Sequence, residues 1–450
     1  MERHYDIVVV GSGSGLKIAA HAAKNGYSVA LIDKGPFGGT CVNRGCIPSK
    51  MVIYPADVIH LLARRNELHI SADNIHPEYE KIIERSASHA EEAAVKIQSK
   101  YAGMEHIDVY TEKATFLADR KIQVGDAVLT GDRFYLPLGS EPMIPDIPGL
   151  DQTPYLTSTQ ALTLKEQPKS LCVLGGGFIA AELAHFFATM GTEVTVLCRS
   201  RFLKHVDSEV RKIIQEQAQQ HYKIEEDCKL KNIGYEKNQF VITGESREWK
   251  SKAVLIAVGR VPPTNDLGLE NTSIQVDKHG YIIVDGQLRT AESKTWAWGD
   301  CIGRYLFRHM ANFEANYLIK HFDSKSAPPI TYPAIPFAVF THPQIAVVGL
   351  TEEALREKGH DLIIGIGEYT DSGMGVARAL THGIVKLIFD QTSRKLLAAH
   401  IIGDEASTMI HMLIAFIHMQ ATLDDMIVCV YIHPALSEVI NMAARNAANL

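Results

Sequence analysis

Two cysteines lie five positions apart near the start of the chain, at Cys41 and Cys46. Glycines come before and between them, and glycine permits a close backbone approach to a ligand. Pro48 suits the first turn of a helix, so we expect Lys50 just inside that helix. A helix N-terminus and a lysine both favour the thiolate, which is the nucleophilic form of cysteine. The segment therefore predicts a redox-active dithiol beside a bound cofactor, with two unrelated buried cysteines as the alternative.

The residues just before the dithiol predict a nucleotide site. Residues 6–33 have the pattern of a strand, a glycine-rich turn, a helix and a second strand that ends at Asp33. Such a turn brings the backbone close to a pyrophosphate at the helix N-terminus, and the acid about 20 residues on accepts a ribose hydroxyl. Leu16 stands at the third glycine position, and a glycine-rich turn of another α/β protein is the alternative. The candidate contacts are Gly11, Gly13, Ser14, Gly15, Asp33 and Lys34.

A second unit of the same kind occupies residues 171–197, and two such units imply two nucleotides. Its turn and helix start contribute the candidate contacts Gly175, Gly177, Phe178 and Ile179. No acid follows its second strand. An acid there favours the free 2′-hydroxyl of NAD, whereas arginines accommodate a 2′-phosphate, so we predict NADPH over NADH. A basic solvated turn is the alternative reading of this stretch, which contains Cys198, Arg199, Ser200, Arg201, Lys204 and His205.

The remaining segments divide the chain into domains. Residues 51–102 are expected to be helical with an interruption near residues 76–77, and residues 111–136 to form a small β meander. Pro/Gly-rich stretches at 136–149 and 324–336 mark linkers. We predict an α/β protein with two Rossmann-like dinucleotide-binding domains and a C-terminal α+β domain. The predicted segments are 1–150, 151–262, 263–330 as a return to the first domain, and 331–450.

The length, charge and cysteine content of the chain exclude several classes of function. At 450 residues the chain is too long for a single core. A net charge of -7 provides no basic field for nucleic acid or an anionic membrane. Seven sparse cysteines, no signal-peptide pattern and no apolar run of 18 residues are typical of a cytoplasmic protein. We therefore expect no nucleic-acid partner and no membrane partner, and we predict no metal site.

Three polar residues in the second half are weaker candidates. Glu438 falls in the first turn of the last expected helix, and His433 precedes it by five residues, which offers an imidazole oriented by a carboxylate. Helix capping is the alternative, since most of the 20 histidines are expected to be structural or solvated. Asp300 follows Gly299 at a strand end and suits either a ligand hydroxyl or an Asx-turn.

Together these features resemble the pyridine nucleotide–disulfide oxidoreductases along essentially the whole chain. The order of the two fingerprints, the dithiol, Gly299-Asp300 and His433…Glu438 matches that family, and the segment at residues 38–50 is its most specific part. Within the family, the similarity is closest to the mycothione reductases, and dihydrolipoyl dehydrogenase and glutathione reductase are also similar. The similarity to mycothione reductase rests on the Gly-Ser-Gly-Ser-Gly turn, residues 50–54, 199–205, 309–315 and 431–436.

The resemblance implies a route for electrons from NADPH to FAD, then to a Cys41–Cys46 disulfide and finally to a low-molecular-weight disulfide. Cys46 would lie against the flavin as the charge-transfer thiolate. Cys41 would attack the substrate, and Cys46 would resolve the mixed disulfide. His433, oriented by Glu438, would be the acid/base and would come from the partner subunit, which implies a homodimer. Such an activity serves cell redox homeostasis.

The resemblance also implies cofactor contacts. Lys50 and Glu182 would form an ion pair beside the flavin and nicotinamide, Asp33 would contact the adenosine ribose, and Asp300 the ribityl chain. Further FAD contacts are implied at Gly39, Thr40, Lys50 and Gly139, and further NADPH contacts at Glu182, Arg199, Arg201 and Gly259.

Several positions depart from the family pattern. Phe178 replaces the usual gating tyrosine, and Pro137-Leu138 replaces the usual Ala-Thr before Gly139. A single Cys429 in place of a C-terminal cysteine pair argues against mercuric reductase and the larger thioredoxin reductases. Two active-site cysteines argue against the single-cysteine coenzyme A disulfide reductases. Dihydrolipoyl dehydrogenase of a 2-oxoacid complex, using NAD, remains the alternative enzyme, and a flavin-bearing redox sensor or interaction protein is the alternative of another class.

Overall fold

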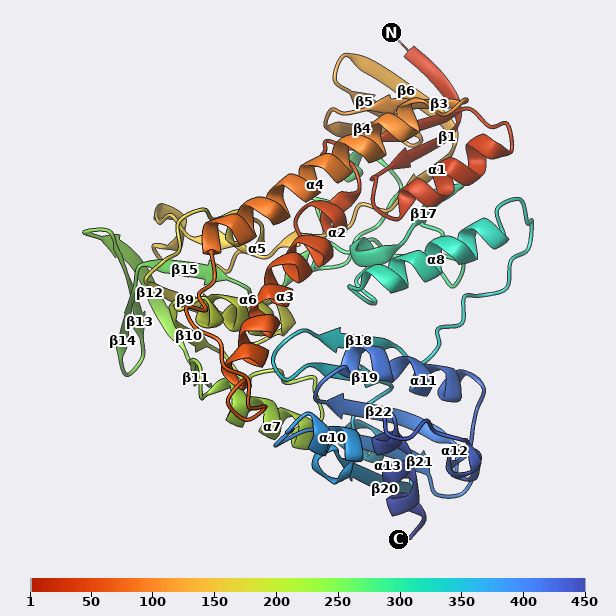
Figure 1. The fold of residues 1–450 in the computed structure, drawn as a ribbon. Helices are drawn as coiled ribbons and strands as arrows, with labels where there is room; N and C mark the ends of the chain where they lie inside the picture. The colour runs from red at the N-terminus through yellow and green to blue at the C-terminus, as the bar shows by residue number, and fades with distance from the viewer. Residues whose placement is uncertain (1, 450) are drawn as a thin grey trace.

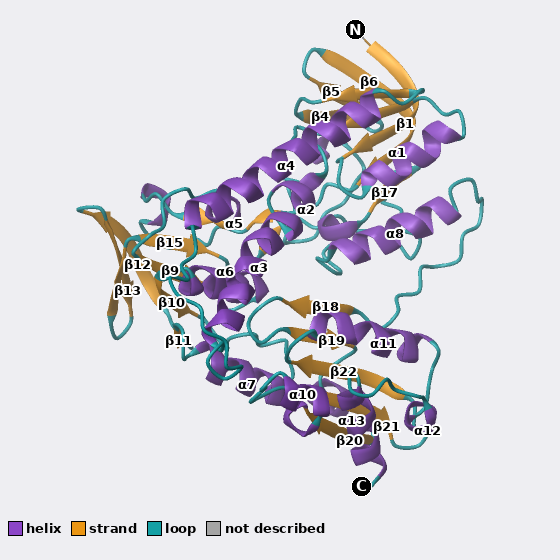
Figure 2. Cartoon of the chain, in the orientation of Figure 1, coloured by secondary structure: helices purple, strands orange, loops and turns teal. Residues whose placement is uncertain are grey.

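The computed structural model describes residues 2–449. Three larger sheets follow one another along the chain, and the two termini lie at opposite ends of the molecule (Figure 1). Helices cover the faces of these sheets, so that strands and helices alternate through much of the chain (Figure 2). This arrangement confirms the predicted α/β class.

The first sheet has seven strands in the order β3-β2-β1-β6-β5-β4, with β17 beside β6. Its central strands are continuous hydrophobic runs, as expected where both faces of a parallel sheet are covered. Ile7, Val8 and Val9 are fully buried, and each such side chain contributes about 1.5–3 kcal/mol to stability. The helices α1 and α8 pack against each other near this sheet. The elements are β1 (Glu2–Val10), α1 (Gly15–Lys24), β2 (Val29–Ile32), β3 (Ile107–Tyr110), β17 (Thr295–Ala297) and α8 (Arg308–Lys320).

The predicted meander is confirmed, with one difference. Its three antiparallel strands are β4 (Ala114–Ala118), β5 (Lys121–Val124) and β6 (Ala127–Leu136). The third strand is longer than a meander needs and also pairs in parallel with β1. The sequence pattern could not reveal this second pairing, because β1 and β6 are more than 100 residues apart. The meander is thus an extension of the central sheet.

Three helices connect the first sheet to the second. They are α2 (Gly39–Asn43), α3 (Cys46–Ala63) and α4 (Tyr79–Ala102), so the predicted interruption of the helical region near residues 76–77 is confirmed. In Figure 1, α3 and α4 run from the first sheet toward the second, and α3 contacts α6 there. Residues on α3 can therefore reach both nucleotide-binding units.

One helical stretch among residues 2–449, Gly39–Ala63, is long and apolar enough to cross a membrane by length and composition alone. A core helix of a soluble protein meets the same criterion, so this is weak evidence. The stretch is also interrupted at Arg44 and Gly45, where α2 ends and α3 has not begun.

The second sheet has five parallel strands in the order β11-β10-β9-β15-β8, and α6 lies between β9 and β10 in sequence. A three-stranded antiparallel sheet, β12-β13-β14, extends from it at the left of Figure 1. The elements are β8 (Leu156–Thr157), α5 (Ser158–Ala161), β9 (Ser170–Leu174), α6 (Phe178–Thr189), β10 (Glu193–Leu197), α7 (Ser208–Ala218), β11 (Lys223–Glu225), β12 (Leu230–Glu236), β13 (Gln239–Gly244), β14 (Glu248–Ser251) and β15 (Ala253–Ile256). Two short strands, β7 (Glu141–Pro142) and β16 (Arg260–Val261), pair where the chain enters and leaves this unit.

The C-terminal part is an antiparallel five-stranded sheet, β18-β19-β22-β21-β20, with helices packed on it. This confirms the predicted α+β unit. The elements are β18 (Pro336–Val339), β19 (Ile345–Val348), α9 (Glu352–Glu357), β20 (Leu362–Glu368), α10 (Gly373–Ala377), β21 (Ile384–Asp390), β22 (Leu396–Ile402), α11 (Ala406–His418), α12 (Leu423–Val428) and α13 (Glu438–Ala448). The boundaries between the predicted domain segments stay predictions.

Candidate active site

The dithiol segment packs directly against the first glycine-rich turn. Cys41 lies on the short helix α2, and Cys46 is the first residue of α3. Gly39 has a positive φ of 67°, and a Cβ added there would come within 2.9 Å of the Gly13 Cα. Only glycine fits this approach. The predicted neighbours Gly13 and Gly39 are therefore brought together with the two cysteines.

The surroundings of the two free thiols make them unequal. A hydrogen bond from the Cys41 thiol, assisted by the charge of Lys50, lowers the pKa of Cys46 to about 7 against the opposing effect of burial. The same hydrogen bond and burial raise the pKa of Cys41. Cys46 also begins a helix of 18 residues, where the dipole favours an anion. Near pH 7, a large share of Cys46 is thiolate, whereas Cys41 keeps its proton.

Lys50 connects the dithiol helix to the second nucleotide-binding unit. Its Nζ lies 2.7 Å from Oε2 of Glu182 on α6, and only 7% of the Glu182 side chain is exposed. The other oxygen of Glu182 accepts a hydrogen bond from the backbone N–H of Phe340 at 3.0 Å. Lys50 also lies over the Phe340 ring, 4.2 Å from its centroid. Residues from three distant parts of the sequence thus hold one ion pair.

The first glycine-rich turn is closed by Asp33 and Pro137. Oδ2 of Asp33 accepts hydrogen bonds from the N–H and hydroxyl of Ser12, at 2.7 and 2.6 Å. A Cβ at Gly15 would lie 2.7 Å from Cγ of Pro137, so the Pro137 departure packs against the turn. The predicted contacts Gly11, Gly13, Ser14 and Gly15 form the turn and the start of α1. Gly139 comes shortly after Pro137 and has a φ of 72°. Thr40 directly precedes Cys41, and Lys34 directly follows Asp33.

Asp300 belongs to a hydrogen-bonded group that the sequence did not reveal. It lies in a short 3-10 helix (Gly299–Ile302), and its carboxylate accepts a hydrogen bond from the Ser140 hydroxyl. Arg260 donates to the Ser140 hydroxyl and carbonyl, at 2.7 and 2.6 Å. Burial raises the pKa of Asp300. Ser140 and Arg260 carried no signal of their own, because they meet Asp300 only in the fold.

A further cation, Arg308, was also missed. It is the first residue of α8 and donates to the Gly13 carbonyl at 3.5 Å. It has no carboxylate partner within salt-bridge distance among residues 2–449. A glycine-rich turn at a helix N-terminus, an unpaired guanidinium and the carboxylate of Asp300 fit a dinucleotide with two phosphates and hydroxyl groups. These residues therefore suit FAD.

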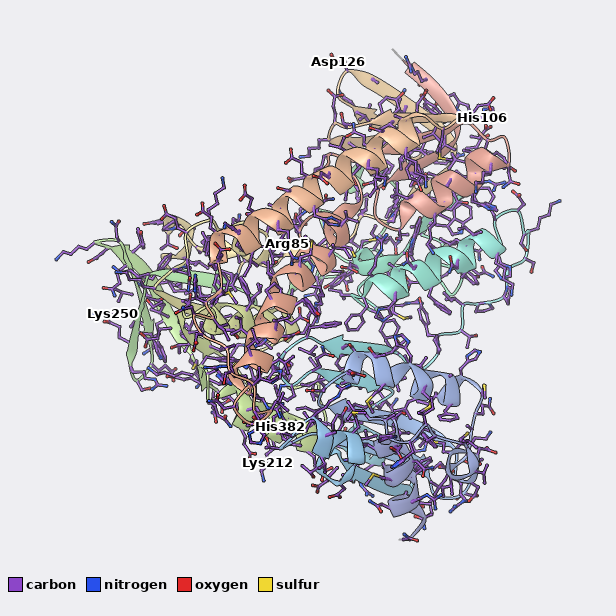
Figure 3. The ribbon with its side chains drawn as sticks, viewed as in Figure 1. Arg85, His106, Asp126, Lys212, Lys250 and His382 are labelled. Carbon is purple, nitrogen blue, oxygen red and sulfur yellow. The ribbon has the colours of Figure 1, made fainter. Side chains whose placement is uncertain are left out.

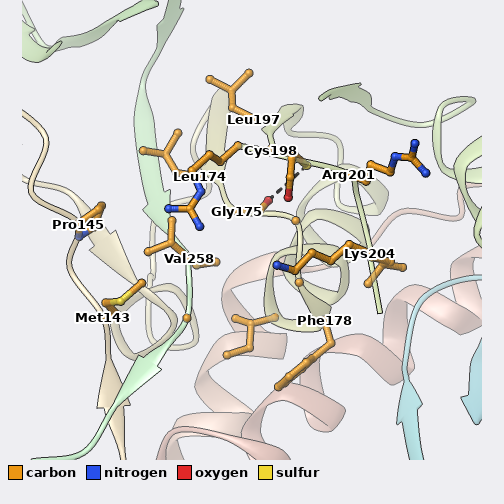
Figure 4. A pocket seen from close by; sticks show the side chains of 18 of the residues that line it. Met143, Pro145, Leu174, Gly175, Phe178, Leu197, Cys198, Arg201, Lys204 and Val258 are labelled. Atoms are coloured by element: carbon orange, nitrogen blue, oxygen red, sulfur yellow. Dashed lines mark hydrogen bonds between the residues drawn. The ribbon is translucent and has the colours of Figure 1, made fainter. Parts of the chain in front are cut away.

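The second glycine-rich turn opens into a cavity of about 860 Å³. Gly175, Gly177, Phe178, Ile179 and Gly259 all line it, as predicted for a nucleotide site. Its basic lining residues are Arg199, Arg201, Lys204, His205, Lys229 and Arg260. In Figure 4 the Lys204 side chain extends toward the glycine turn, whereas the Arg201 guanidinium points away from it. Arg201 was the predicted contact and Lys204 only its neighbour, because residue type and spacing do not reveal the direction of a side chain.

Phe178 begins α6 at the edge of this cavity and is 37% exposed. Its ring packs against Phe307 at a centroid distance of 6.1 Å. A flat aromatic side chain is thus present where the family has a tyrosine, without the hydroxyl.

His433 and Glu438 form the predicted imidazole–carboxylate pair, but one chain does not bring them to the cysteines. Nδ1 of His433 lies 2.9 Å from Oε1 of Glu438, whose other oxygen accepts from the Ala435 N–H at 2.9 Å. These hydrogen bonds lower the pKa of Glu438. The His433 side chain is 78% exposed. The segment between α12 and α13 lies in the lower part of Figure 1, away from α2.

Residues 5–315 match the pyridine nucleotide-disulphide oxidoreductase family, and residues 335–444 match the dimerisation domain of the same family. The chain therefore belongs to this family and is an enzyme of its class, a flavoprotein that uses FAD and a pyridine nucleotide. The resemblance deduced from the motifs is confirmed. The dimerisation domain supports a homodimer.

Three known proteins are similar over nearly the whole chain. Mycothione reductase of Mycobacterium tuberculosis is 34% identical over 456 residues, which cover 98% of each chain. Dihydrolipoyl dehydrogenase of Chlorobaculum tepidum is 32% identical over 98% of this chain and 97% of its own. The structure of the flavoprotein disulfide reductase RclA from Escherichia coli has a TM-score of 0.90 and 28% identity, and it covers 98% of this chain and 99% of that chain.

Proposed function

We propose that this chain is a homodimeric, NADPH-dependent reductase of a low-molecular-weight disulfide, similar in activity to mycothione reductase. One observation carries the proposal. Cys46, with its pKa lowered to about 7 in part by the charge of Lys50, is linked through Lys50 to Glu182 on α6, the helix whose first residues line the second nucleotide cavity. This is a continuous set of residues from a nucleotide site to a thiolate. A cytoplasmic location stays a prediction from the sparse cysteines.

The proposed chemistry needs two half-reactions. The first glycine-rich turn, Asp33 and Asp300 would hold FAD, which would supply the relay of two electrons from NADPH. The Cys41–Cys46 disulfide would open on receiving these electrons. Cys41 then gives up its proton and attacks one sulfur of the substrate, and the other sulfur leaves as a thiolate that must gain a proton. His433 of the partner subunit, held by Glu438, would move these protons. Cys46 finally attacks the Cys41 sulfur, which re-forms the disulfide and releases the second thiol.

The choice of NADPH is supported by the charge of the second cavity. Six basic residues line it, and Asp146 is the single acid among its lining residues in the described part of the chain. A 2′-phosphate carries extra negative charge that such a lining attracts, whereas the 2′-hydroxyl of NADH gains little from it. Lys204 and Arg199 are the proposed phosphate contacts.

The shared active site is supported by the surface around His433. Val428, Val430 and Ile432 are 78%, 99% and 78% exposed. Large apolar side chains exposed together are typical of a protein interface. Residues Ile47, Tyr54, Val58 and Leu61 form a second exposed apolar stripe on α3, next to the dithiol. Burial of both surfaces between two chains would carry His433 to the partner's cysteines.

Steady-state turnover of the FAD-loaded protein tests the proposal. We expect reduction of a low-molecular-weight disulfide with NADPH at a much higher kcat/KM than with NADH. The disulfides to compare are oxidised glutathione, a mycothiol-type disulfide, lipoamide and cystine. Oxidation of dihydrolipoamide with NAD far faster than reduction of any disulfide with NADPH would instead identify a dihydrolipoyl dehydrogenase.

A further inference from the structure

Four histidines gather outside the active site, and the proposed reaction uses none of them. The His60 ring lies nearly parallel to His342, with centroids 4.5 Å apart, and to His185, 5.1 Å apart. His185 and His342 are also nearly parallel, at 6.4 Å. His221, just after α7, meets His60 edge-on at 4.7 Å. We call these four residues the histidine cluster.

The cluster joins the same three elements that hold the Lys50–Glu182 ion pair. Those elements are α3, α6 and the segment that follows β18. Each of these elements contributes one residue to the ion pair or to the hydrogen bond that supports it. Each also contributes a second residue, later in the chain, to the histidine cluster. The residues are Lys50 and His60 on α3, Glu182 and His185 on α6, and Phe340 and His342 after β18.

Two hydrogen bonds hold the rings of His60 and His185 in place. The His60 ring is 9% exposed, and its Nε2 lies 2.9 Å from Oγ1 of Thr189 on α6. His185 is 4% exposed, and its Nε2 lies 3.1 Å from Oδ1 of Asp57 on α3, within the usual hydrogen-bond range. The contacts therefore run in both directions between α3 and α6. They leave no set of three ring nitrogens, among the described residues, arranged around a metal ion.

Three of the rings, those of His60, His342 and His221, are held in the neutral form. Burial, reinforced by the other rings, lowers the pKa of His60 to about 2 and that of His342 to about 3. The pKa of His221 is also lowered. The titratable and charged groups that face the cluster from the surrounding elements are Asp57 on α3, Arg64 directly after α3, and His382 before β21. Asp404, after β22, acts on His382. His382 is labelled in Figure 3, near the contact of α7 with the C-terminal sheet.

We propose that the histidine cluster is a second clamp between α3 and α6 that positions the Lys50–Glu182 pair, and that it holds only while the rings of His60, His221 and His342 are neutral. This inference rests on the proposed function, because the ion pair acts in that reaction. Flat neutral rings pack closely, whereas a proton on one of them would introduce a charge into a buried site beside other rings. The cluster acts through the ion pair, so its members are positioning residues.

The effect of acid on the stability of the cluster follows from the direction of the histidine pKa shifts. The folded state keeps the rings of His60, His221 and His342 neutral, while the unfolded chain binds protons below its ordinary histidine pKa of about 6.5. The stability contributed by the cluster is therefore complete above pH ~6.5 and is lost as the pH falls from there toward the folded pKa values.

Positioning is tested by His60→Ala and His60→Phe, with the exposed His279→Ala as a control. The rate at which NADPH reduces the flavin is measured in a single turnover. We expect His60→Ala to slow it about tenfold, a usual cost of a misplaced reacting group, and His60→Phe to restore most of the rate by refilling the stack. A wild-type rate in His60→Ala, or an equal loss in both variants, would overturn the proposal. If His60→Ala does not fold, His342→Ala and His342→Phe make the same comparison.

The dependence on neutral rings is tested without turnover. Urea unfolding of the FAD-loaded protein is followed between pH ~7.5 and ~5, across the pKa of an unfolded histidine. We expect the midpoint of the wild type to fall more than that of His60→Phe, since the variant lacks one titrating ring. An equal fall would overturn the neutral-ring clamp. Absence of flavin reduction by NADPH in the wild type would count against the proposed function instead, and the acid comparison would still decide the clamp.

Discussion

Cys41 and Cys46 have the same chemistry in isolation, and their neighbours give them different protonation states. The hydrogen bond from Cys41 and the charge of Lys50 lower the pKa of Cys46 to about 7, and the same hydrogen bond raises that of Cys41. A thiolate is the electron donor in a charge-transfer contact, whereas a protonated thiol needs a base before it can attack. This difference supports the inner role proposed for Cys46 and the outer role proposed for Cys41.

Cys41→Ser separates the two roles. We expect it to abolish disulfide turnover while NADPH still reduces the flavin at close to the wild-type rate, because Cys46 and the Lys50–Glu182 pair remain. Steady-state turnover and single-turnover flavin reduction measure the two steps. Cys46→Ser is the matched variant and should lose the long-wavelength thiolate–flavin absorbance that Cys41→Ser keeps. Disulfide turnover in Cys41→Ser would contradict the nucleophile assignment.

Lys50→Met tests the electrostatic cause of the Cys46 shift. Removal of a nearby positive charge should raise the pKa of Cys46 by about one unit or more. The thiolate forms as the pH rises through the pKa, so the long-wavelength absorbance should appear at a higher pH in Lys50→Met than in the wild type. Lys50→Arg keeps the charge and is the control. An unchanged midpoint would show that Lys50 does not set the pKa.

At the scale of residues, the sequence predicted the dithiol, the glycine-rich turns and Asp33, because the residues of each motif are close together in the chain. It missed Ser140, Arg260 and Arg308, whose contacts with Asp300 and Gly13 arise only in the fold. It also could not distinguish Lys204 from Arg201.

At the scale of elements, the turn after β10 supplies the residues proposed to distinguish NADPH from NADH. The strand ends at Leu197, and a run of basic residues follows it into the cavity. The sequence showed the missing acid and the basic composition. The side-chain directions depend on the path of the loop between β10 and α7, which no local pattern encodes.

Lys204→Met should weaken NADPH more than NADH. Loss of one charge-assisted contact to a 2′-phosphate is expected to raise KM for NADPH about tenfold and to leave KM for NADH nearly unchanged. Initial rates with the two nucleotides measure this. Lys212→Met removes the same charge from α7 outside the cavity and serves as the control; Lys212 is labelled in Figure 3. Equal effects on both nucleotides would refute the phosphate contact.

The element boundaries were predictable where periodicity and turns agreed, as for the helical region that breaks between α3 and α4. Strand pairing was less predictable. The alternating pattern of β4 to β6 indicated a meander, while the parallel pairing of β6 with β1 required partners far apart in the chain.

At the scale of the whole molecule, one chain carries two separate halves of the proposed site. The dithiol and the Lys50–Glu182 pair lie between the two nucleotide-binding units, and the His433–Glu438 pair lies in the dimerisation domain. The order of motifs implied this division through the family resemblance. The exposed apolar surfaces of α3 and residues 428–432 became visible only with the fold.

The shared site is tested most directly by mixing two inactive variants, Cys41→Ser and His433→Ala, through co-expression with different affinity tags. In a symmetric dimer each site takes its dithiol from one chain and its histidine from the other. A mixed dimer then has one intact site, so random assembly should recover about a quarter of wild-type disulfide turnover. His433→Ala alone should be slower than the wild type by about 10²–10⁴-fold. Turnover of the mixture no greater than that of the separate variants would contradict a site shared between two chains.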